Sequence, residues 1–184
     1  MDAGPVSFRE LEERDLPLMH KWLNAPHVSK WYAISKRNPS EESVGDKYIP
    51  RIRGEDPTTC YAILYGDAPV GMVQSCRLDD YPSVKADYDL EGKVAGIDIF
   101  IGEEGYVYRG LGSNIMRRFL KEIVFVRYDV DCCIVDPNPE NTSAIRAYEK
   151  AGFGYVKTVW NSTEKVWAYL MTIKRTDLEW EAVL

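Results

Sequence analysis

Long hydrophobic runs are absent from this 184-residue chain, and histidine is scarce, with two residues. A helix that crosses a bilayer needs about 18 or more consecutive apolar residues, so we expect no membrane anchor. The opening residues, MDAGPVSFRE, lack a basic and apolar signal segment, and we expect a cytoplasmic protein. The four cysteines, Cys60, Cys76, Cys132 and Cys133, show no metal-ligand spacing. We interpret them as buried thiols and predict no metal site.

An excess of basic residues is also missing, because 23 Lys and Arg stand against 29 Asp and Glu, for a net charge of −6. Nucleic-acid binding needs a basic surface, so we exclude that class of partner. One segment holds eight acidic residues and two lysines: Asp79, Asp80, Asp87, Asp89, Glu91, Asp98, Glu103 and Glu104, with Lys85 and Lys93. Such a segment favours a cationic partner, and the alternative is a solvated acidic loop.

The rest of the composition, 45% hydrophobic and 28% charged, is typical of a globular protein. We predict one domain over residues 1–184, without linker or internal repeat. Residue patterns predict strands over 6–11, 59–65, 70–78, 94–101, 132–135, 155–160 and 166–174. They predict helices over 16–24, 40–52 and 142–150, and one beginning at 108–113. This order predicts an α/β (α+β) fold with one mixed sheet and helices on both faces.

Several residues are typical of helix ends and turns. We expect Asp15, Ser40 and Asn141 (or Thr142) to cap helices. Gly152 lies where a left-handed residue commonly ends a helix. Gly66-Asp67 predicts a tight hairpin turn, whereas 27–32 and 79–93 are interpreted as irregular segments.

The stretch from Val94 to Phe119 carries the clearest chemical signal. A strand is followed by a short acidic loop and then by a glycine-rich turn, Tyr108-Arg109-Gly110-Leu111-Gly112-Ser113, that opens a helix. Ile115, Phe119 and Ile123 recur every four residues and predict one buried helix face. Backbone N–H groups at the start of a helix bind phosphate well, although such a turn also serves only to reverse the chain.

A second block, Asn141-x-x-Ala144-x-x-x-Tyr148-x-x-x-Gly152-Phe153, follows the glycine turn in the order seen in acetyl-CoA-dependent N-acetyltransferases. With this spacing the chain resembles the GNAT superfamily. It looks most like the aminoglycoside 6′-N-acetyltransferases, on motifs that extend over most of the chain: Trp22-Leu23-Asn24, Tyr48-Ile49-Pro50, Gly71-x-x-Gln74-Ser75, Gly96-Ile97-Asp98 and Asp136-Pro137-x-Pro139-x-Asn141. One position departs from the family, because Val107 stands where many members have Gln or Arg.

The resemblance implies a mostly antiparallel mixed sheet with a V-shaped split between its central strands, where acetyl-CoA inserts as co-substrate. It implies that backbone groups of the central strand hold the pantetheine arm and that the glycine turn holds the pyrophosphate. The residues implied in acetyl-CoA binding are Ile99, Phe100, Ile101, Tyr108, Arg109, Gly110, Leu111, Gly112, Ser113, Asn141 and Ala144. Asn141 could also serve only as a helix cap.

Two residues are implied in catalysis. Asp98 would anchor and orient the 6′-amine, and an ordinary aspartate is too acidic to be a good base for an ammonium group unless burial or neighbouring carboxylates alter it. Tyr148 would donate a proton to the departing coenzyme A sulfur. The structural alternatives are a helix cap or ion pair for Asp98, and packing on the sheet for Tyr148.

The resemblance further implies a polycationic aminoglycoside as substrate and antibiotic resistance as the outcome. The residues implied in substrate binding are Trp31, Tyr32, Gln74, Asp87, Asp89, Asp98 and Asp136. The two aromatic residues could instead close the core. Rival functions are acetylation of a protein N-terminus or a hydroxamate-siderophore lysine, and non-catalytic binding of an aminoglycoside or acyl-CoA. We expect a monomer or a homodimer.

Overall fold

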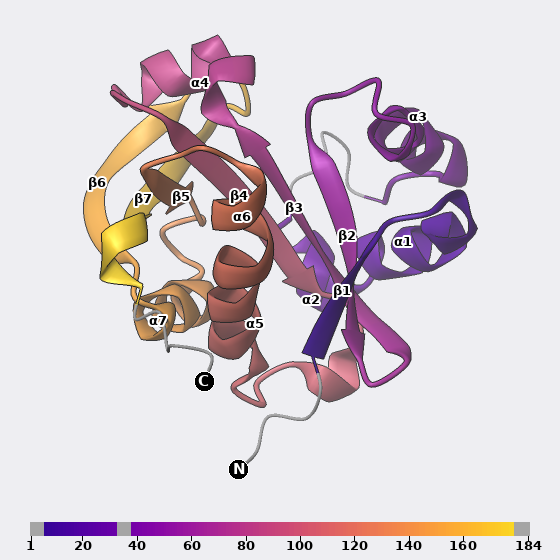
Figure 1. Ribbon diagram of the computed structural model, residues 1–184. Coiled ribbons are helices and arrows are strands. Elements are labelled where there is room, and N and C mark those ends of the chain that lie inside the picture. The colour runs from indigo at the N-terminus through magenta and orange to yellow at the C-terminus, as the bar shows by residue number, and fades with distance from the viewer. Residues whose placement is uncertain (1–5, 33–37, 179–184) are drawn as a thin grey trace. The chain divides into compact units, whose positions relative to one another are not determined.

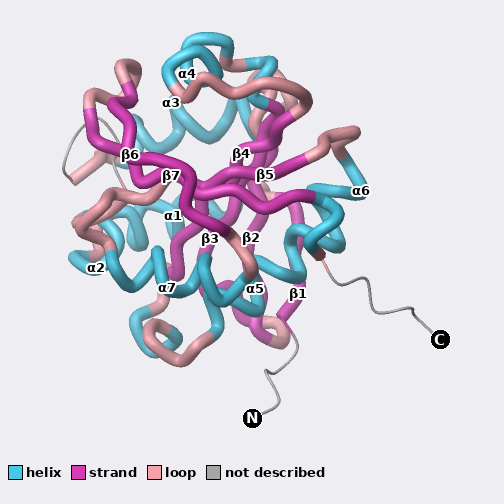
Figure 2. The backbone as a smooth tube through the Cα atoms, turned by 90° about the vertical axis from the view of Figure 1, so that its left-hand side faces the viewer, coloured by secondary structure: helices cyan, strands magenta, loops and turns pink. Residues whose placement is uncertain are grey.

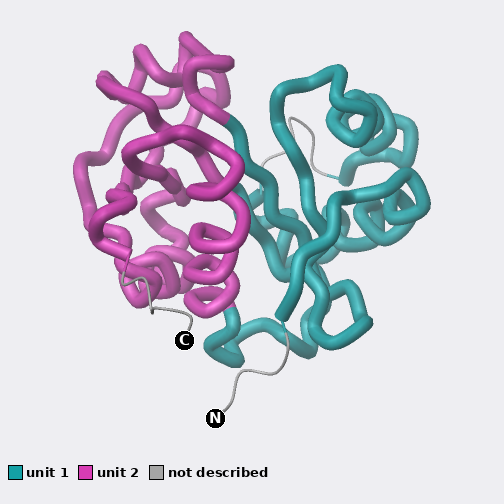
Figure 3. Tube along the Cα trace, in the orientation of Figure 1, with its two compact units in different colours: residues 1–76, 98–111 teal, residues 77–97, 112–184 magenta. Residues whose placement is uncertain are grey.

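The computed structural model describes residues 6–32 and 38–178. These residues form two compact units (Figure 3), one made of residues 1–76 and 98–111 and the other of residues 77–97 and 112–184. Each unit therefore combines segments that are distant in the sequence. The single domain over residues 1–184 stays a prediction.

Unit 1 contains the first three strands and the first three helices (Figure 1). Strands β1 (Val6–Glu10), β2 (Thr59–Tyr65) and β3 (Ala68–Arg77) pair antiparallel in sequence order, and helices α1 (Leu16–Leu23), α2 (Pro26–Ser29) and α3 (Glu41–Ile52) complete the unit. Its core buries side chains from all three helices against β2, β3 and Phe100 of β4. Burial of such apolar side chains supplies most of the folding free energy.

Glycines bring β3 close to the strand beside it within unit 1. A Cβ atom at Gly71 would lie 2.3 Å from the carbonyl oxygen of Phe100, so only glycine fits there. Gly102 likewise has no room for a side chain, because its Cβ would lie 2.1 Å from Cγ of Trp22. Three residues after Gly71, the side chain of Gln74 forms a hydrogen bond with Asp98.

Unit 2 contains the remaining strands and helices. Strand β5 (Cys132–Val135) pairs antiparallel with β7 (Val166–Lys174), which pairs antiparallel with β6 (Gly154–Asn161) (Figure 2). The helices are α4 (Pro82–Asp87), α5 (Leu111–Phe119), α6 (Phe125–Arg127) and α7 (Thr142–Ala151). A Cβ atom at Gly112 of α5 would lie 3.4 Å from Cβ of Ala147, so these two helices pack closely.

Strand β4 (Val94–Ile101) contributes residues to both units. It pairs in parallel with β5 over three residues of each strand, Val94–Gly96 with Cys132–Ile134, and continues for five residues past the last pair. The sheet order is β1-β2-β3-β4-β5-β7-β6. The prediction of an α/β fold with one mixed, mostly antiparallel sheet is confirmed.

Helix caps follow the sequence patterns in most places. Ser40 Oγ accepts from the N–H of Ser43, Asn141 Oδ1 accepts from the N–H of Ala144, and Gly152 adopts a φ of 108° at the end of α7. Asp15 stands at the start of α1 without capping it, and that prediction is wrong. Its carboxylate instead accepts two bonds from the Arg9 guanidinium and one from the N–H of Glu12.

The helix after the glycine turn departs from the predicted four-residue stripe. Ile115, Phe119 and Leu120 are fully buried, but Ile123 is only half-buried and Val124 is buried in its place, because residues Leu120–Val124 form a π-helical turn. A π turn adds one residue and moves the buried position from i+4 to i+5.

Two segments interpreted as irregular contain short helices. Residues 82–87 form α4 and residues 26–29 form α2, each with a proline at its first position. Proline is well suited to that position because its φ is already helical and its missing N–H is not needed. We had expected only loops there, so both expectations are wrong.

Candidate active site

Asp98 lies at an exposed position in β4, and its carboxylate is held from the side by Gln74 of β3. Gln74 Nε2 donates to Asp98 Oδ2 over 2.7 Å, and Gln74 itself is 6% exposed. Among the described residues, neither a helix N–H nor a cationic side chain binds Asp98. Within this part of the chain, a cap or an ion pair therefore does not account for its position, and the other Asp98 oxygen has no hydrogen bond to a described residue.

The amide oxygen of Gln74 also has hydrogen-bond partners. This atom, Oε1, accepts from Arg51 Nη1 of α3 over 2.7 Å and from the Cys60 thiol over 3.4 Å. The exposed carboxylate is thus the outer end of a chain of polar groups that runs into unit 1.

The two aromatic residues implied in sugar stacking are both half-buried. Tyr32 packs edge-on against Phe100, with ring centroids 4.9 Å apart, and Lys47 Nζ lies 5.5 Å from the centre of the Tyr32 ring. Lys30 Nζ lies 4.4 Å from the centre of the Trp31 ring. These contacts favour core packing for Tyr32, and a stacking role for either ring stays a prediction.

Asp136 in unit 2 follows β5 and is also held by a buried polar side chain. Tyr88 donates its hydroxyl proton to Asp136 Oδ2, and Asn161 Nδ2 donates to the Tyr88 oxygen over 2.8 Å. Burial and the nearby Asp136 carboxylate raise the pKa of Tyr88 above its ordinary value, so the phenol keeps its proton. Asn161 Oδ1 accepts from the N–H groups of Thr163 and Glu164, which fixes the orientation of its amide.

The other acidic candidates lie around α4. Asp87 Oδ2 accepts from the N–H and Oγ of Ser162, at 2.8 and 2.6 Å, and these bonds lower the pKa of its carboxyl group. Asp89 is exposed and has a φ of 50°. Part of the acidic segment is therefore already committed to internal contacts.

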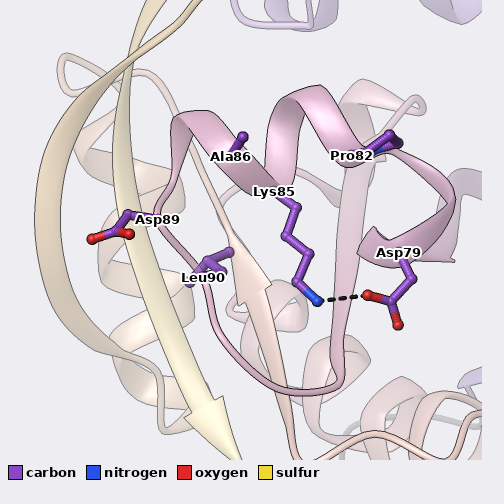
Figure 4. Close-up of a pocket in the computed structure, with 6 residues that line it drawn as sticks. All are labelled: Asp79, Pro82, Lys85, Ala86, Asp89 and Leu90. Carbon is purple, nitrogen blue, oxygen red and sulfur yellow. Dashed lines mark hydrogen bonds and ion pairs between the residues drawn. The ribbon is translucent and has the colours of Figure 1, made fainter.

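A pocket of about 490 Å³ lies beside α4, lined by Asp79, Pro82, Lys85, Ala86, Asp89 and Leu90 (Figure 4). Lys85 points toward Asp79 and binds its carboxylate over 2.5 Å, while Asp89 follows the C-terminal end of the helix. The ion pair neutralises one wall of the pocket, so it does not form a uniformly acidic site.

The backbone of the glycine turn is left-handed at two positions. Gly110 has a φ of 77°, and a Cβ atom there would meet nothing within 4 Å. Tyr108 also adopts a positive φ, 61°, and its side chain is 85% exposed. Arg109 is exposed next to it, so this part of the turn is accessible.

Strand residues 99–101 alternate between half-buried and buried side chains. His27 contacts the carbonyl oxygen of Ile101 through Nε2, over 3.1 Å. One of the two lone pairs of that carbonyl is therefore already engaged.

Helix α7 carries the remaining candidates. Asn141 caps it, Ala144 is half-buried in its first turn, and Tyr148 is 9% exposed with its ring 6.0 Å from that of Phe153. Packing thus explains part of the placement of Tyr148. Its role as an acid stays a prediction.

Sequence reasoning missed three residues behind these carboxylates: Tyr88, which donates to Asp136, and Arg51 and Asn161, which donate to Gln74 and Tyr88. Arg51 sits on a helix face with Tyr48, where the apolar pattern gave no sign of a buried cation. Tyr88 and Asn161 are 73 residues apart, and no local spacing links them.

Among the described residues, no helix is long and apolar enough to cross a membrane. In the same part of the chain, no group of three or more His, Cys, Asp or Glu side chains could hold a metal ion.

Comparison with known proteins identifies the family. The acetyltransferase (GNAT) domain matches residues 12–160. The chain is 30% identical to the aminoglycoside N(6′)-acetyltransferase type 1 of Klebsiella pneumoniae over 84% of this chain and 76% of that protein.

Solved structures agree with this match. The aminoglycoside acetyltransferase AAC(6′)-Ib in complex with coenzyme A and kanamycin has a TM-score of 0.82 and 30% identity, over 94% of this chain and 96% of that one. A spermidine N-acetyltransferase from Vibrio cholerae shares the fold, with a TM-score of 0.73 and 16% identity over 94% and 97% of the two chains. The chain therefore belongs to the GNAT family of acetyltransferases.

Proposed function

We propose that this protein is an aminoglycoside 6′-N-acetyltransferase, which transfers acetyl from acetyl-CoA to the 6′-amine of an aminoglycoside in one ternary complex. The observation that carries the proposal is the exposed Asp98 carboxylate, oriented by Gln74, in a chain 30% identical to an enzyme of that name. A fixed, accessible carboxylate is what a polycationic sugar amine needs for capture and orientation.

The glycine turn supports acetyl-CoA as co-substrate. Gly110 leaves open space where a side chain would stand, and α5 begins directly after it. The start of a nine-residue helix favours phosphate through its N–H groups and its dipole. Arg109 would add a positive charge there. It would replace the Gln or Arg that many family members have at the position of Val107.

The backbone of Asp98 to Ile101 extends past the last residues that pair with β5. We infer that the N–H groups of this segment hold the pantetheine arm and polarise the carbonyl group that reacts. When bound, acetyl-CoA supplies the acetyl thioester.

Asp98 and Asp136 would bind ammonium groups of the sugar. The attacking 6′-amine must first lose a proton, and Asp98 would orient the nitrogen while the proton leaves through water. The nitrogen–carbon bond then forms as the carbon–sulfur bond breaks, and the Tyr148 hydroxyl would give its proton to the sulfur. The nitrogen loses its second proton to water, and Tyr148 takes a proton back from water. No covalent acyl-enzyme is needed, since holding both substrates together removes much of the entropic barrier.

The test is a thiol-release assay with acetyl-CoA and 6′-amino aminoglycosides such as kanamycin and tobramycin, followed by NMR of the product. Acetylation at the 6′ nitrogen is expected. The matched control is an aminoglycoside with a 6′-hydroxyl, which should give no product at that position.

Other amines separate the rival functions. Peptides with a free N-terminus and N-hydroxylysine are included in the same assay, and a preference for either would replace the proposal with that function. Calorimetric binding of both ligands without any turnover would indicate a non-catalytic binder. A cytoplasmic location and a monomeric or homodimeric state stay predictions.

A further inference from the structure

We propose that Arg51 is a positioning residue that orients the Gln74 amide, so that Gln74 donates to Asp98 and leaves the second Asp98 oxygen for the substrate ammonium. The proposal deepens the proposed function and rests on it. All three side chains lie in unit 1, and both connecting hydrogen bonds measure 2.7 Å.

The end of a glutamine side chain is nearly symmetric in shape. The two ends of its amide have nearly the same shape, so only the neighbouring groups decide which end carries the oxygen. A carboxylate can only accept, and it must therefore face the NH₂ end. A guanidinium can only donate, and it must face the oxygen end.

Two donors hold that oxygen. Arg51 Nη1 and the Cys60 thiol both donate to Gln74 Oε1. Burial raises the pKa of Cys60 to about 12, so the thiol keeps its proton and stays a donor. The stronger of the two is Arg51, because hydrogen bonds from charged donors contribute about twice as much as neutral ones.

The surroundings of Arg51 point to a role beyond stability. Its side chain is 14% exposed, and its Nε lies 3.6 Å from Asp56 Oδ1, too far for a hydrogen bond. Among the described residues this Nε has no hydrogen-bond partner. Arg51 is thus a largely buried cation whose ion pair with Asp56 is long and, within the described part of the chain, has no hydrogen bond through Nε. Such a pair contributes little to stability relative to an apolar residue, so the cation is better explained by what it orients.

The other titratable groups around the amide do not replace Arg51. Burial raises the pKa of Tyr32 and of Tyr48, which keeps both phenols neutral. Lys47 lies over the rings of these two tyrosines, 5.5 and 5.6 Å from their centres. The cation that contacts Gln74 is therefore Arg51, and Asp56 is the carboxylate paired with it.

Loss of Arg51 should free the amide to rotate. In half of the rotated states the amide oxygen would face Asp98 and repel its carboxylate. The expected result is weaker capture of the aminoglycoside.

A double-mutant cycle tests this with kanamycin as substrate, using Arg51→Met, Gln74→Met and the double variant. Arg51→Met should raise the KM for kanamycin about tenfold, with a smaller change in kcat and none in the KM for acetyl-CoA. In the Gln74→Met background the same substitution should change KM less than about twofold. An equal loss in both backgrounds would overturn the proposal.

The matched control is Arg53→Met. Arg53 follows Arg51 by two residues, is about half exposed and pairs with Glu13 over 2.9 Å, away from Gln74. Arg51→Lys keeps a donor-only cation and should recover part of the lost affinity, which a purely structural role in packing would not predict. Thermal melting of each variant identifies any that is unfolded. If Arg51→Met is unfolded, the KM of Arg51→Lys is compared with that of the wild type instead.

A second measurement does not depend on turnover. The side-chain amide protons of Gln74, followed by ¹H–¹⁵N NMR, should move toward the shifts of a free amide in Arg51→Met and stay unchanged in Arg53→Met. Unchanged Gln74 signals in Arg51→Met would overturn the positioning role. Absence of any acetylation by the wild-type protein would instead overturn the proposed function, so the two failures are distinguishable.

Discussion

Asp98 in unit 1 and Asp136 in unit 2 are both candidate substrate carboxylates, but different groups hold them. Asp98 accepts from the amide of Gln74, which a buried arginine orients. Asp136 accepts from the phenol of Tyr88, which the amide of Asn161 orients. In each case a second buried side chain fixes the direction of the hydrogen bond.

The difference lies in how firmly the direction is fixed. A phenol that keeps its proton can always donate to a carboxylate by rotating its hydroxyl. An amide can present the wrong end, so Gln74 depends on its cation more than Tyr88 depends on Asn161. Asp98 is also exposed whereas Asp136 is half-buried. The site on β4 should therefore be the more sensitive to substitution, both in the carboxylate and behind it.

The largest effect is expected for Asp98→Asn. The substitution keeps an acceptor for Gln74 but removes the charge, so kcat/KM for kanamycin should fall about 100-fold. The affinity for acetyl-CoA, measured by calorimetry, should not change. Glu42→Gln, at an exposed position on α3, is the control. Intact activity in Asp98→Asn would reject the role of Asp98.

Tyr148→Phe tests whether unit 2 acts on turnover as well as on binding. A thiol leaves fairly well without help, so kcat should fall roughly 10- to 100-fold with little change in KM. Steady-state kinetics measure both constants, and Tyr155→Phe, on the exposed face of β6, is the control. An unchanged kcat would leave Tyr148 with only its packing role.

Asp136→Asn tests the second carboxylate directly. Asn keeps an acceptor for Tyr88, so the fold should be retained while KM for kanamycin rises about tenfold and kcat changes less. A loss as large as that in Asp98→Asn would contradict the ranking of the two sites.

Tyr88→Phe tests whether the Tyr88 hydroxyl contributes mainly to the stability of the fold or to substrate binding by Asp136. The change leaves the buried Asn161 amide without its acceptor, and the free energy of unfolding should fall by about 2 kcal/mol. KM for kanamycin should rise only about threefold, because Asp136 keeps its charge. Urea denaturation and steady-state kinetics measure the two effects. A large KM effect with unchanged stability would reverse this assignment.

The smallest effect concerns pH and Asp87. Hydrogen bonds from Ser162 lower the pKa of Asp87, so this contact is present above the ordinary pKa of an aspartate and is lost as pH falls through the lowered value. The ¹H–¹⁵N signal of Ser162 should therefore titrate only in the acidic range, and in Asp87→Asn it should show no such step. A step near neutral pH would contradict the contact.

Local patterns predicted most elements because each depends on neighbours in sequence. The apolar runs at 59–65, 132–135 and 166–174 predicted β2, β5 and β7 with the bounds that the structure has. The patterns failed where the local signal was ambiguous: a proline-initiated helix at 82–87 resembled a loop, and the π turn at 120–124 displaced the buried face by one residue.

The candidate site was predictable only in part. Motif spacing led to Asp98, Gln74, Asp136 and the glycine turn, and the family assignment is confirmed by the GNAT domain match over residues 12–160. The roles of the individual site residues stay predictions.

The sequence by itself determined the family, the strand and helix order and the residue types available for chemistry, since these follow from spacing along the chain. Only the tertiary structure decided which side chains stand behind the carboxylates. Arg51 meets Gln74 across 23 positions and Asn161 meets Tyr88 across 73. Hydrogen bonds depend on distances of about 3 Å and on direction, and no pattern along the chain encodes either between such distant residues.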